Sequence, residues 1–272
     1  MTAELFKKMP FSLVYQNNML PVSHEVFNII LSYVKEKTNG RPLDIALDVG
    51  CGTGLSTLPL APHFKKVQGV DISESQLNVA KQYNTASNVS YMLGAAEKLP
   101  VNNDSVDLVN ASLAAHWFNV DKFTKEAARV LNTNGCLAVH AFYPGLEVEY
   151  KDLSHDLNKV ISEIWNTLNP YTDPIGINLM RSQYHDIYES IPLKDKTWIT
   201  DIPVQFQMSI SEILGFFRTV YMFQIFLEKD EKRAEEFLMQ TKRRMQDILG
   251  EEADSVLLNV HMKNYCVLAC KH

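Results

Sequence analysis

The sequence predicts an α/β protein built on a doubly wound parallel sheet. Short apolar segments alternate with segments of helical spacing through residues 43–142, as expected for repeated strand–helix–strand units. The first strand, "LDIALDV", is almost continuously apolar, which indicates burial on both faces. The glycine-rich stretch "GCGTG" follows it at residues 50–54. In open parallel sheets, this first strand-to-helix turn is the usual place for a ligand.

Each element of the alternating part has its own signal. Helical spacing of apolar residues predicts helices over 22–34, 73–83 and 120–131. Ser73 is a plausible N-cap, and Gly135 is expected to cap the third helix at its end. Pro59 and Pro62 predict that the helix after the glycine loop is short or irregular. Further strands are expected at 66–71, 89–94, 105–112 and 135–142.

The pattern changes after Pro144. Helices are expected over 153–168 and 231–249, and a third opens with the capping box Ser209 and Glu212. Two prolines and a glycine predict a loop over 169–178. The remaining β-rich segments are 196–208 and a last strand over 265–270.

Composition restricts the class of protein. The 272 residues are 46% hydrophobic and carry a net charge of −6, so we expect one globular domain and no nucleic-acid partner. No apolar run approaches about 20 residues, and the N-terminus does not resemble a secretory signal, so neither a membrane nor export is expected. The four cysteines show no zinc-binding spacing, which predicts a cytoplasmic protein with reduced thiols and no metal.

The glycine loop fits neither common phosphate cradle. Leu55 stands where a dinucleotide-binding GxGxxG loop has its third glycine, and no Lys-Ser or Lys-Thr pair follows. Asp48, at the end of the first strand, would repel a pyrophosphate and attract a cation. Asp71 ends the second strand, where a carboxylate can accept hydrogen bonds from ribose hydroxyls. The residues therefore indicate a ligand with a ribose and a cationic group.

Four motifs in order, "LDVGCGTG", "GVDIS", "GAAEKLP" and "AAHWFNVDKFTKEAARVLNTNG", resemble class I S-adenosylmethionine-dependent methyltransferases. Within that class, the chain is similar to the small-molecule branch that contains trans-aconitate methyltransferase. The resemblance covers about residues 40–145. It implies a Rossmann-like sheet of seven strands with a helical substrate-binding insertion, and S-adenosylmethionine as the cofactor, which leaves as S-adenosylhomocysteine.

The resemblance also implies roles for matching residues. The loop would pack under the methionine part and the ribose, Asp48 would anchor the ammonium group directly or through water, and Asp71 would hold the ribose. Many relatives have an aspartate at the position of Ala95, so Glu97 or backbone groups would bind the adenine amino group here. The residues that the resemblance places against the cofactor are Tyr15, Asp48, Gly50, Cys51, Gly52, Asp71, Ile72, Ala95, Ala96, Glu97, Ala111 and Ser112.

The transfer itself needs alignment of a nucleophile with the methyl group, and a base only for a protonated nucleophile. His116 is the candidate base; alternatively, His116 and Trp117 form a structural turn of the pocket wall. Tyr143, at the end of the fifth strand, is a candidate substrate contact. Arg181 would suit an anionic substrate, although a solvated helix face is an equal interpretation.

These observations predict a methyltransferase that acts on a small molecule, most simply at an oxygen such as that of a carboxylate. N-methylation of a small amine, and a cofactor-binding regulatory protein without catalysis, are the alternatives. We expect a monomer or weak dimer and one domain over 1–272. Its predicted parts are a helical cap (1–40), a cofactor-binding half (41–145) and helical lid elements (146–195 and 209–250).

Overall fold

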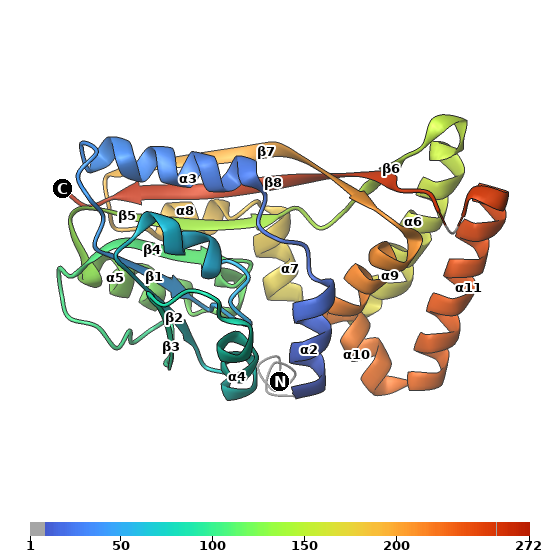
Figure 1. Ribbon diagram of the computed structural model, residues 1–272, viewed down its shortest axis with the longest axis horizontal. Helices are drawn as coiled ribbons and strands as arrows, with labels where there is room; N and C mark the ends of the chain where they lie inside the picture. The colour runs from blue at the N-terminus through green and yellow to red at the C-terminus, as the bar shows by residue number, and fades with distance from the viewer. Residues whose placement is uncertain (1–8, 254) are drawn as a thin grey trace.

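One mixed sheet of eight strands organises the part of the chain that this computed structural model describes, residues 9–253 and 255–272 (Figure 1). The strand order is β3-β2-β1-β4-β5-β8, with β6 and β7 also paired to β8. The strands are β1 (Ile45–Val49), β2 (Lys66–Asp71), β3 (Val89–Leu93), β4 (Val106–Ser112), β5 (Leu131–Phe142), β6 (Glu147–Glu149), β7 (Asp195–Met208) and β8 (Leu258–Cys270).

The first five strands are parallel, and β8 runs antiparallel to β5, β6 and β7. The carboxyl ends of β1, β2 and β4 therefore meet at one edge, which is where ligands bind in open α/β sheets. The predicted α/β fold class is confirmed, and β6 is a short strand beyond the seven predicted.

Helices cover both faces of the sheet. They are α2 (Met9–Asn18), α3 (His24–Lys37), α4 (Glu74–Tyr83), α5 (Val120–Val130), α6 (Ser154–Leu168), α7 (Pro174–Arg181), α8 (His185–Ser190), α9 (Ile210–Thr219), α10 (Tyr221–Lys229) and α11 (Glu231–Leu249). Short 3-10 turns are η1 (Leu58–His63), η2 (Ala115–Trp117), η3 (Lys151–Leu153), η4 (Asn169–Tyr171) and η5 (Gly250–Glu252).

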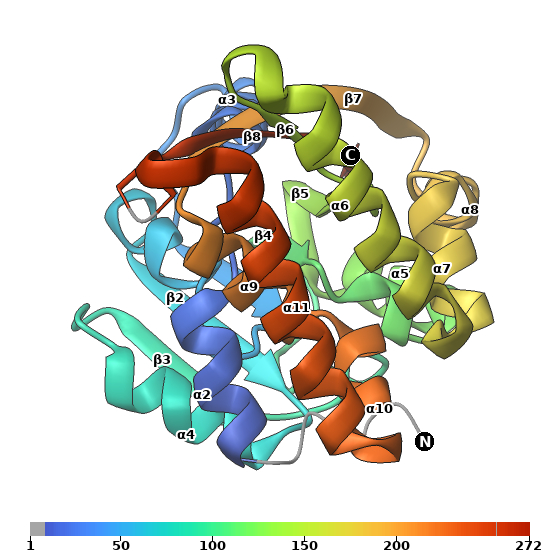
Figure 2. The same cartoon turned by 90° about the vertical axis from the view of Figure 1, so that its right-hand side faces the viewer.

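Three apolar clusters hold these layers together. In the first, α3 and η1 pack on one face of the central strands. In the second, α5, α7 and α8 pack on the other face. The third joins α6, α9, α10 and α11 to the far ends of β7 and β8, and forms a helical lobe beside the sheet (Figures 1 and 2). The cavity described below lies where the lobe meets the carboxyl edge of the sheet.

Three local predictions differ from the structure. The segment expected as a loop over 169–178 contains most of α7, because Asp173 caps a helix that opens on Pro174, a residue well suited to the first helical position. Gly135 is not a helix cap; it lies inside β5, which begins directly after α5. The apolar run after Ser209 is broken into α9 and α10 at Val220, whose backbone is extended.

By length and composition, no single helix of the described residues could cross a membrane. Only α9 and α10 pass that test as a pair, and they are bent by 78°. Both helices contribute side chains to the third cluster, as core helices do. Residues 1–8 of the predicted helical cap lie outside the described part of the chain.

The carboxylate of Asp107 links the amino end of β4 to the start of β1. This carboxylate is 1% exposed and accepts hydrogen bonds from Arg41, Asn132 and the backbone N–H groups of Asp44 and Ile45. These donors hold the pKa of Asp107 below its usual range despite burial.

Asp107→Ala should therefore lower the free energy of unfolding by about 2–4 kcal/mol at neutral pH, since it leaves several buried donors without a partner. A lowered carboxyl pKa stabilises the fold above the unfolded-state pKa, and this contribution is lost as the pH falls through the folded-state pKa. Urea titrations at pH 7 and pH 3 should show a smaller difference between variant and wild type at pH 3. An equal difference at both values would contradict this account.

Candidate functional site

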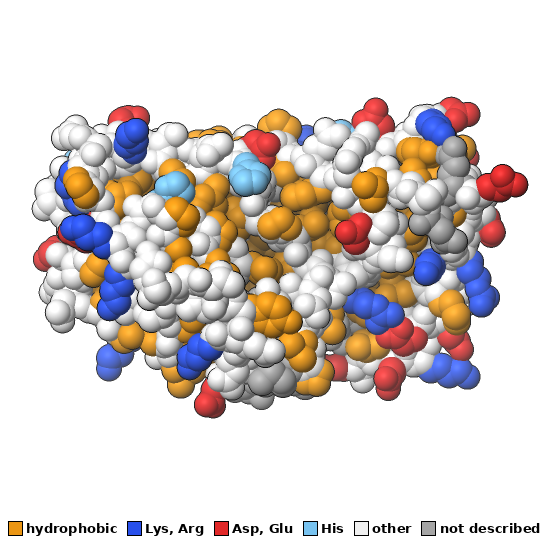
Figure 3. Space-filling view, in the orientation of Figure 1, with side chains coloured by type: hydrophobic (Ala, Val, Ile, Leu, Met, Phe, Trp, Pro, Cys, Tyr) orange, Lys and Arg blue, Asp and Glu red, His pale blue; other side chains and the backbone are white. Residues whose placement is uncertain are grey.

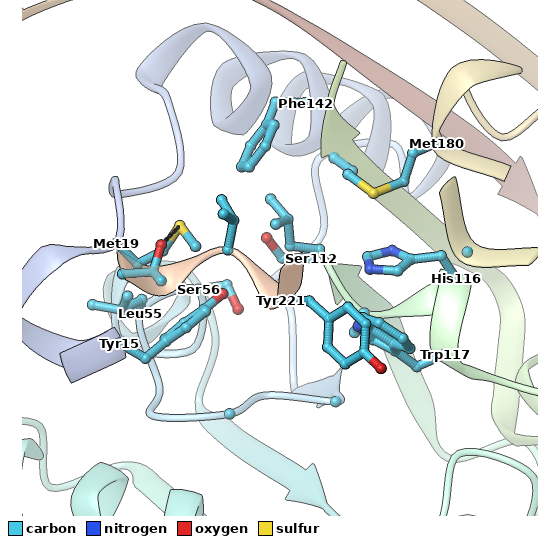
Figure 4. A pocket seen from close by; sticks show the side chains of 18 of the residues that line it. Tyr15, Met19, Leu55, Ser56, Ser112, His116, Trp117, Phe142, Met180 and Tyr221 are labelled. Atoms are coloured by element: carbon cyan, nitrogen blue, oxygen red, sulfur yellow. Dashed lines mark hydrogen bonds between the residues drawn. The ribbon is translucent and has the colours of Figure 1, made fainter. Parts of the chain in front are cut away.

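A cavity of about 290 Å³ lies between the carboxyl edge of the sheet and the helical lobe. Figure 3 shows hydrophobic side chains around a hollow in the middle of that face. Figure 4 shows Tyr15, Met19, Leu55 and Ser56 on one side of the cavity, and His116, Trp117 and Met180 on the other. The glycine loop, Asp71 and Ile72 also line the cavity. The space therefore joins the predicted cofactor residues to a largely apolar end.

The glycine loop approaches the cavity closely because its backbone takes conformations that other residues rarely adopt. Gly50 has φ +67°, and a Cβ there would lie 2.5 Å from the Cβ of Ala114. At Gly54, with φ +88°, a Cβ would lie 2.4 Å from the hydroxyl of Tyr91. Gly54 is thus required for packing, whereas Gly50, Cys51 and Gly52 line the cavity.

Asp71 lines the cavity at the end of β2, and its carboxylate is fixed by the backbone. One oxygen accepts a hydrogen bond from the Gly52 N–H at 2.9 Å and the other from the Ser73 N–H at 2.8 Å. Burial raises the pKa of Asp71, and these donors oppose the rise. Because each carboxylate oxygen accepts more than one hydrogen bond, Asp71 retains acceptor capacity toward a ligand.

Asp48, which is predicted to anchor the ammonium group directly or through water, is not among the residues that line the cavity. It is fully buried and accepts hydrogen bonds from Ser56 Oγ at 2.7 Å, Thr57 Oγ1 at 2.6 Å and Asn110 Nδ2 at 2.8 Å. Burial raises the pKa of Asp48, and these three donors lower it. The carboxylate therefore anchors the segment after the glycine loop to β1 and β4.

The other predicted cofactor residues divide into two groups. Tyr15, Ile72, Ala96, Glu97 and Ser112 line the cavity, and Ile72 is 52% exposed, which is unusual for an isoleucine. Ala95 and Ala111 do not line it: Ala95 forms an isolated bridge with Lys98, and Ala111 is buried in the core. Ala95 and Ala111, two predicted cofactor contacts, therefore lie behind the residues that form the cavity wall.

His116 lines the cavity from η2, and its Nδ1 lies 2.7 Å from the hydroxyl of Tyr184, a fully buried residue just before α8. Burial lowers the pKa of His116 to about 3. The imidazole is therefore neutral at physiological pH. No pattern in the sequence pairs Tyr184 with His116.

The apolar end of the cavity comes largely from the segment that sequence reasoning resolved least. The ring centroids of Trp117 and Tyr221 lie 5.1 Å apart (Figure 4). Tyr143 and Arg181 do not line the cavity; Arg181 is exposed, and its nearest side-chain partner is Asn169, at 3.4 Å. The apolar side chains that line the cavity outside the glycine loop include Met19, Leu20, Leu113, Phe142, Trp165, Ile177, Met180, Phe206, Val220, Met222 and Met262.

Sequence reasoning missed Asp173, which lines the cavity at the amino end of α7. Its available signal was the Asp-Pro pair at 173–174, a common helix start. Among the described residues, those that line this cavity include Asp71, Glu97 and Asp173 but no lysine or arginine.

Comparisons with known proteins agree with this geometry. The model of a methyltransferase domain family matches residues 47–139. A methyltransferase of Dictyostelium discoideum is 29% identical over 94% of this chain and 92% of its own length. The structure of a type II methyltransferase from Anaeromyxobacter dehalogenans superposes with a TM-score of 0.70 at 21% identity, over 90% of this chain and 97% of that one.

The protein is an S-adenosylmethionine-dependent methyltransferase. The fold is the Rossmann-like class I fold, and the matched domain contains the glycine loop, Asp71 and His116. A ubiquinone biosynthesis O-methyltransferase of Bartonella quintana is 30% identical over 43% of this methyltransferase, a match that spans about half (53%) of the relative. The cavity-lining part of α7 lies beyond the matched domain.

The methyltransferase should tolerate Asp48→Asn far better than Asp48→Ala. An asparagine keeps one acceptor, and the hydroxyls of Ser56 and Thr57 can rotate to accept from its amide. The alanine variant leaves three buried donors unpaired and should lose about 2–4 kcal/mol of unfolding free energy. Calorimetry should show that the asparagine variant binds S-adenosylhomocysteine within about threefold of the wild-type affinity. A tenfold loss of affinity, about 1.4 kcal/mol, would instead indicate that Asp48 contacts the cofactor directly.

His116 should stay neutral across the working range of the enzyme. NMR titration of its ring protons should show no midpoint between pH 5 and pH 8. Because its folded-state pKa lies below the unfolded value, the folded state binds fewer protons, and each pH unit below about 6.5 should cost about 1.4 kcal/mol of stability from this residue. His116→Gln should reduce that slope; a midpoint between pH 6 and pH 7 in the wild type would contradict the buried, neutral imidazole.

Proposed function

We propose that the enzyme transfers the methyl group of S-adenosylmethionine to an oxygen of a small molecule that it encloses next to the cofactor. The observation that carries the proposal is the cavity that runs from the glycine loop and Asp71 to an aromatic and apolar end. A polymer would need an open groove, and phosphate binding would need cations that the described residues lining this cavity do not supply.

The cofactor would lie along the carboxyl edge of the sheet. Asp71 would accept the ribose hydroxyls, as acidic residues at this position do in related folds. Ile72 and Ala96 would pack on the adenine, which would account for an isoleucine that is half exposed when the cavity is empty of ligand. Glu97 would lie at the adenine edge, and Tyr15 from α2 would close over the methionine end.

The remaining cavity would then align the substrate. A sulfonium is a strong electrophile, so catalysis depends on placing the nucleophile in line with the methyl group and on excluding water. The apolar residues at the far end provide such exclusion. Their number favours a substrate whose body is mostly apolar.

The acceptor group can be narrowed by charge. A buried carboxylate needs a cationic or multiple neutral partners, and neither lysine nor arginine lines this cavity. Carboxylate methylation, one form of the predicted O-methylation, therefore has less support than methylation of a hydroxyl. An amine is the second candidate, because the carboxylates at Asp71, Glu97 and Asp173 favour a cation.

Asp71 provides the test of this placement. Asp71→Asn should weaken S-adenosylhomocysteine binding about 10- to 100-fold, as expected when charged hydrogen bonds worth about 1.5–3 kcal/mol are lost. Asp247→Asn, at an exposed aspartate of α11, is the matched control and should bind like wild type. Calorimetry measures both. If wild-type protein bound neither the cofactor nor its product, or if Asp71→Asn bound as tightly as wild type, the placement would be wrong.

A further inference from the structure

The hydrogen bond between His116 and Tyr184 fixes which imidazole nitrogen carries the proton. Burial raises the pKa of Tyr184 above its usual range, so its hydroxyl keeps a proton that must be donated. The hydroxyl proton therefore points to Nδ1, the side-chain atom within 2.7 Å. Tyr265 packs edge-on against Tyr184, and its own hydroxyl has no partner among the described residues, so it does not compete.

A neutral imidazole that accepts at Nδ1 carries its hydrogen on Nε2. No described residue hydrogen-bonds to Nε2, and the ring lines the cavity (Figure 4). His116 thus offers the substrate a neutral N–H donor. It has no free lone pair with which to take a proton, so the predicted role as a general base does not fit this arrangement.

An acceptor lies beside this donor. Asp173 lines the cavity, and its Oδ2 caps α7 by accepting the Gly176 N–H at 2.7 Å, while Oδ1 has no partner among the described residues. A Cβ on Gly176 would lie 3.1 Å from Asp173 Oδ2 and 3.6 Å from His116 Cδ2, the ring carbon bonded to Nε2. The glycine therefore lets the carboxylate and the imidazole edge lie close together.

We propose that His116 and Asp173 form a donor–acceptor pair that recognises a hydroxyl group on an apolar substrate. A hydroxyl oxygen can accept from Nε2–H while its hydrogen is donated to Asp173. A carboxylate has no hydrogen to give to Asp173, and an ammonium group has no lone pair to accept from His116. The inference rests on the proposed function and selects the hydroxyl among its acceptors.

The two residues would have different roles in the reaction: Asp173 would accept the substrate proton, and His116 would remain a hydrogen-bond donor. The substrate oxygen forms a bond to the methyl carbon as the sulfur–methyl bond breaks and its electron pair returns to sulfur, which neutralises the sulfonium. The hydroxyl proton passes to Asp173, which then releases it to water. His116 keeps its proton throughout and adds no positive charge beside the sulfonium.

The other titratable groups near this pair are consistent with the assignment. Burial, with a smaller contribution from the Asp173 charge, raises the pKa of Tyr221, so that phenol also stays neutral. Burial lowers the pKa of His140 to about 4, and its Nε2 is bound to Asn110 at 3.1 Å. Asp71 accepts from the Gly52 N–H of the glycine loop, and Glu97 accepts from the Asn119 N–H beyond η2. Of these carboxylates, Asp173 is the one that lies beside Gly176 together with His116.

The product tests the substrate class. Purified enzyme, isotope-labelled S-adenosylmethionine and a small-molecule extract of cells should give a labelled product that moves into organic solvent and resists alkali, as a methyl ether does. A label released as methanol by alkali would indicate an ester, and a labelled cation would indicate an amine; either overturns the hydroxyl assignment while methyl transfer stands. If no extract yields any labelled product, the proposed function itself fails.

Variants test the two residues. Asp173→Asn preserves the helix cap, since asparagine is as good an N-cap as aspartate, but removes the basic oxygen. It should lower kcat about 10²- to 10⁴-fold, with little change in KM or in S-adenosylhomocysteine affinity. Asp186→Asn, at an exposed aspartate of α8, is the control and should match wild type. Asp173→Asn at wild-type kcat would overturn the proposal.

Tyr184 is a positioning residue, and its readout is spectroscopic. Nitrogen-15 NMR of the wild type with S-adenosylhomocysteine bound should show His116 protonated at Nε2 and bare at Nδ1. Tyr184→Phe should remove the constraint and give a mixture of both tautomers, with a fall in kcat. A wild-type His116 that is protonated at Nδ1 would contradict the donor role.

Discussion

A buried chain of polar side chains holds the ligand-binding edge of the sheet together. Asp48 at the end of β1 accepts from Asn110 Nδ2 on β4, and Asn110 Oδ1 accepts from His140 Nε2 on β5. Asp48 also accepts from Ser56 and Thr57, beyond the glycine loop. Three adjacent parallel strands and the loop are thereby fixed to one another. In a low-dielectric interior such a network is stable only when its members are satisfied, which makes its geometry specific.

This constraint determines the shape of the cofactor end. With the loop held at both ends, its backbone can approach the cavity, and the close contact between Gly50 and Ala114 leaves no room for a side chain. Asp71 is then oriented by the Gly52 N–H, so the loop and this carboxylate position one another. The glycine motif is usually interpreted as a set of ligand contacts. In this protein, part of the motif instead packs and hydrogen-bonds within the fold.

That distinction explains how much of the site could be predicted from sequence. The order of strands, the edge at which they end and the importance of Asp71 follow from local patterns that burial on both faces of a sheet makes strong. The role of Asp48 could not be separated from direct contact, because a carboxylate at a strand end can face either the ligand or the loop. The substrate end depends on how α7 packs, and residues of that helix cannot be placed until the packing is known.

Arg181, the last residue of α7, is exposed and does not line the cavity, whereas Ile177 and Met180 of the same helix do. The described residues that line the cavity include no lysine or arginine, so they would not repel the positive sulfonium charge of a bound cofactor. A neutral His116 avoids repelling that charge, whereas a protonated one would oppose cofactor binding. The burial of His116 and its hydrogen bond to Tyr184 therefore serve both the electrostatics and the orientation of the site.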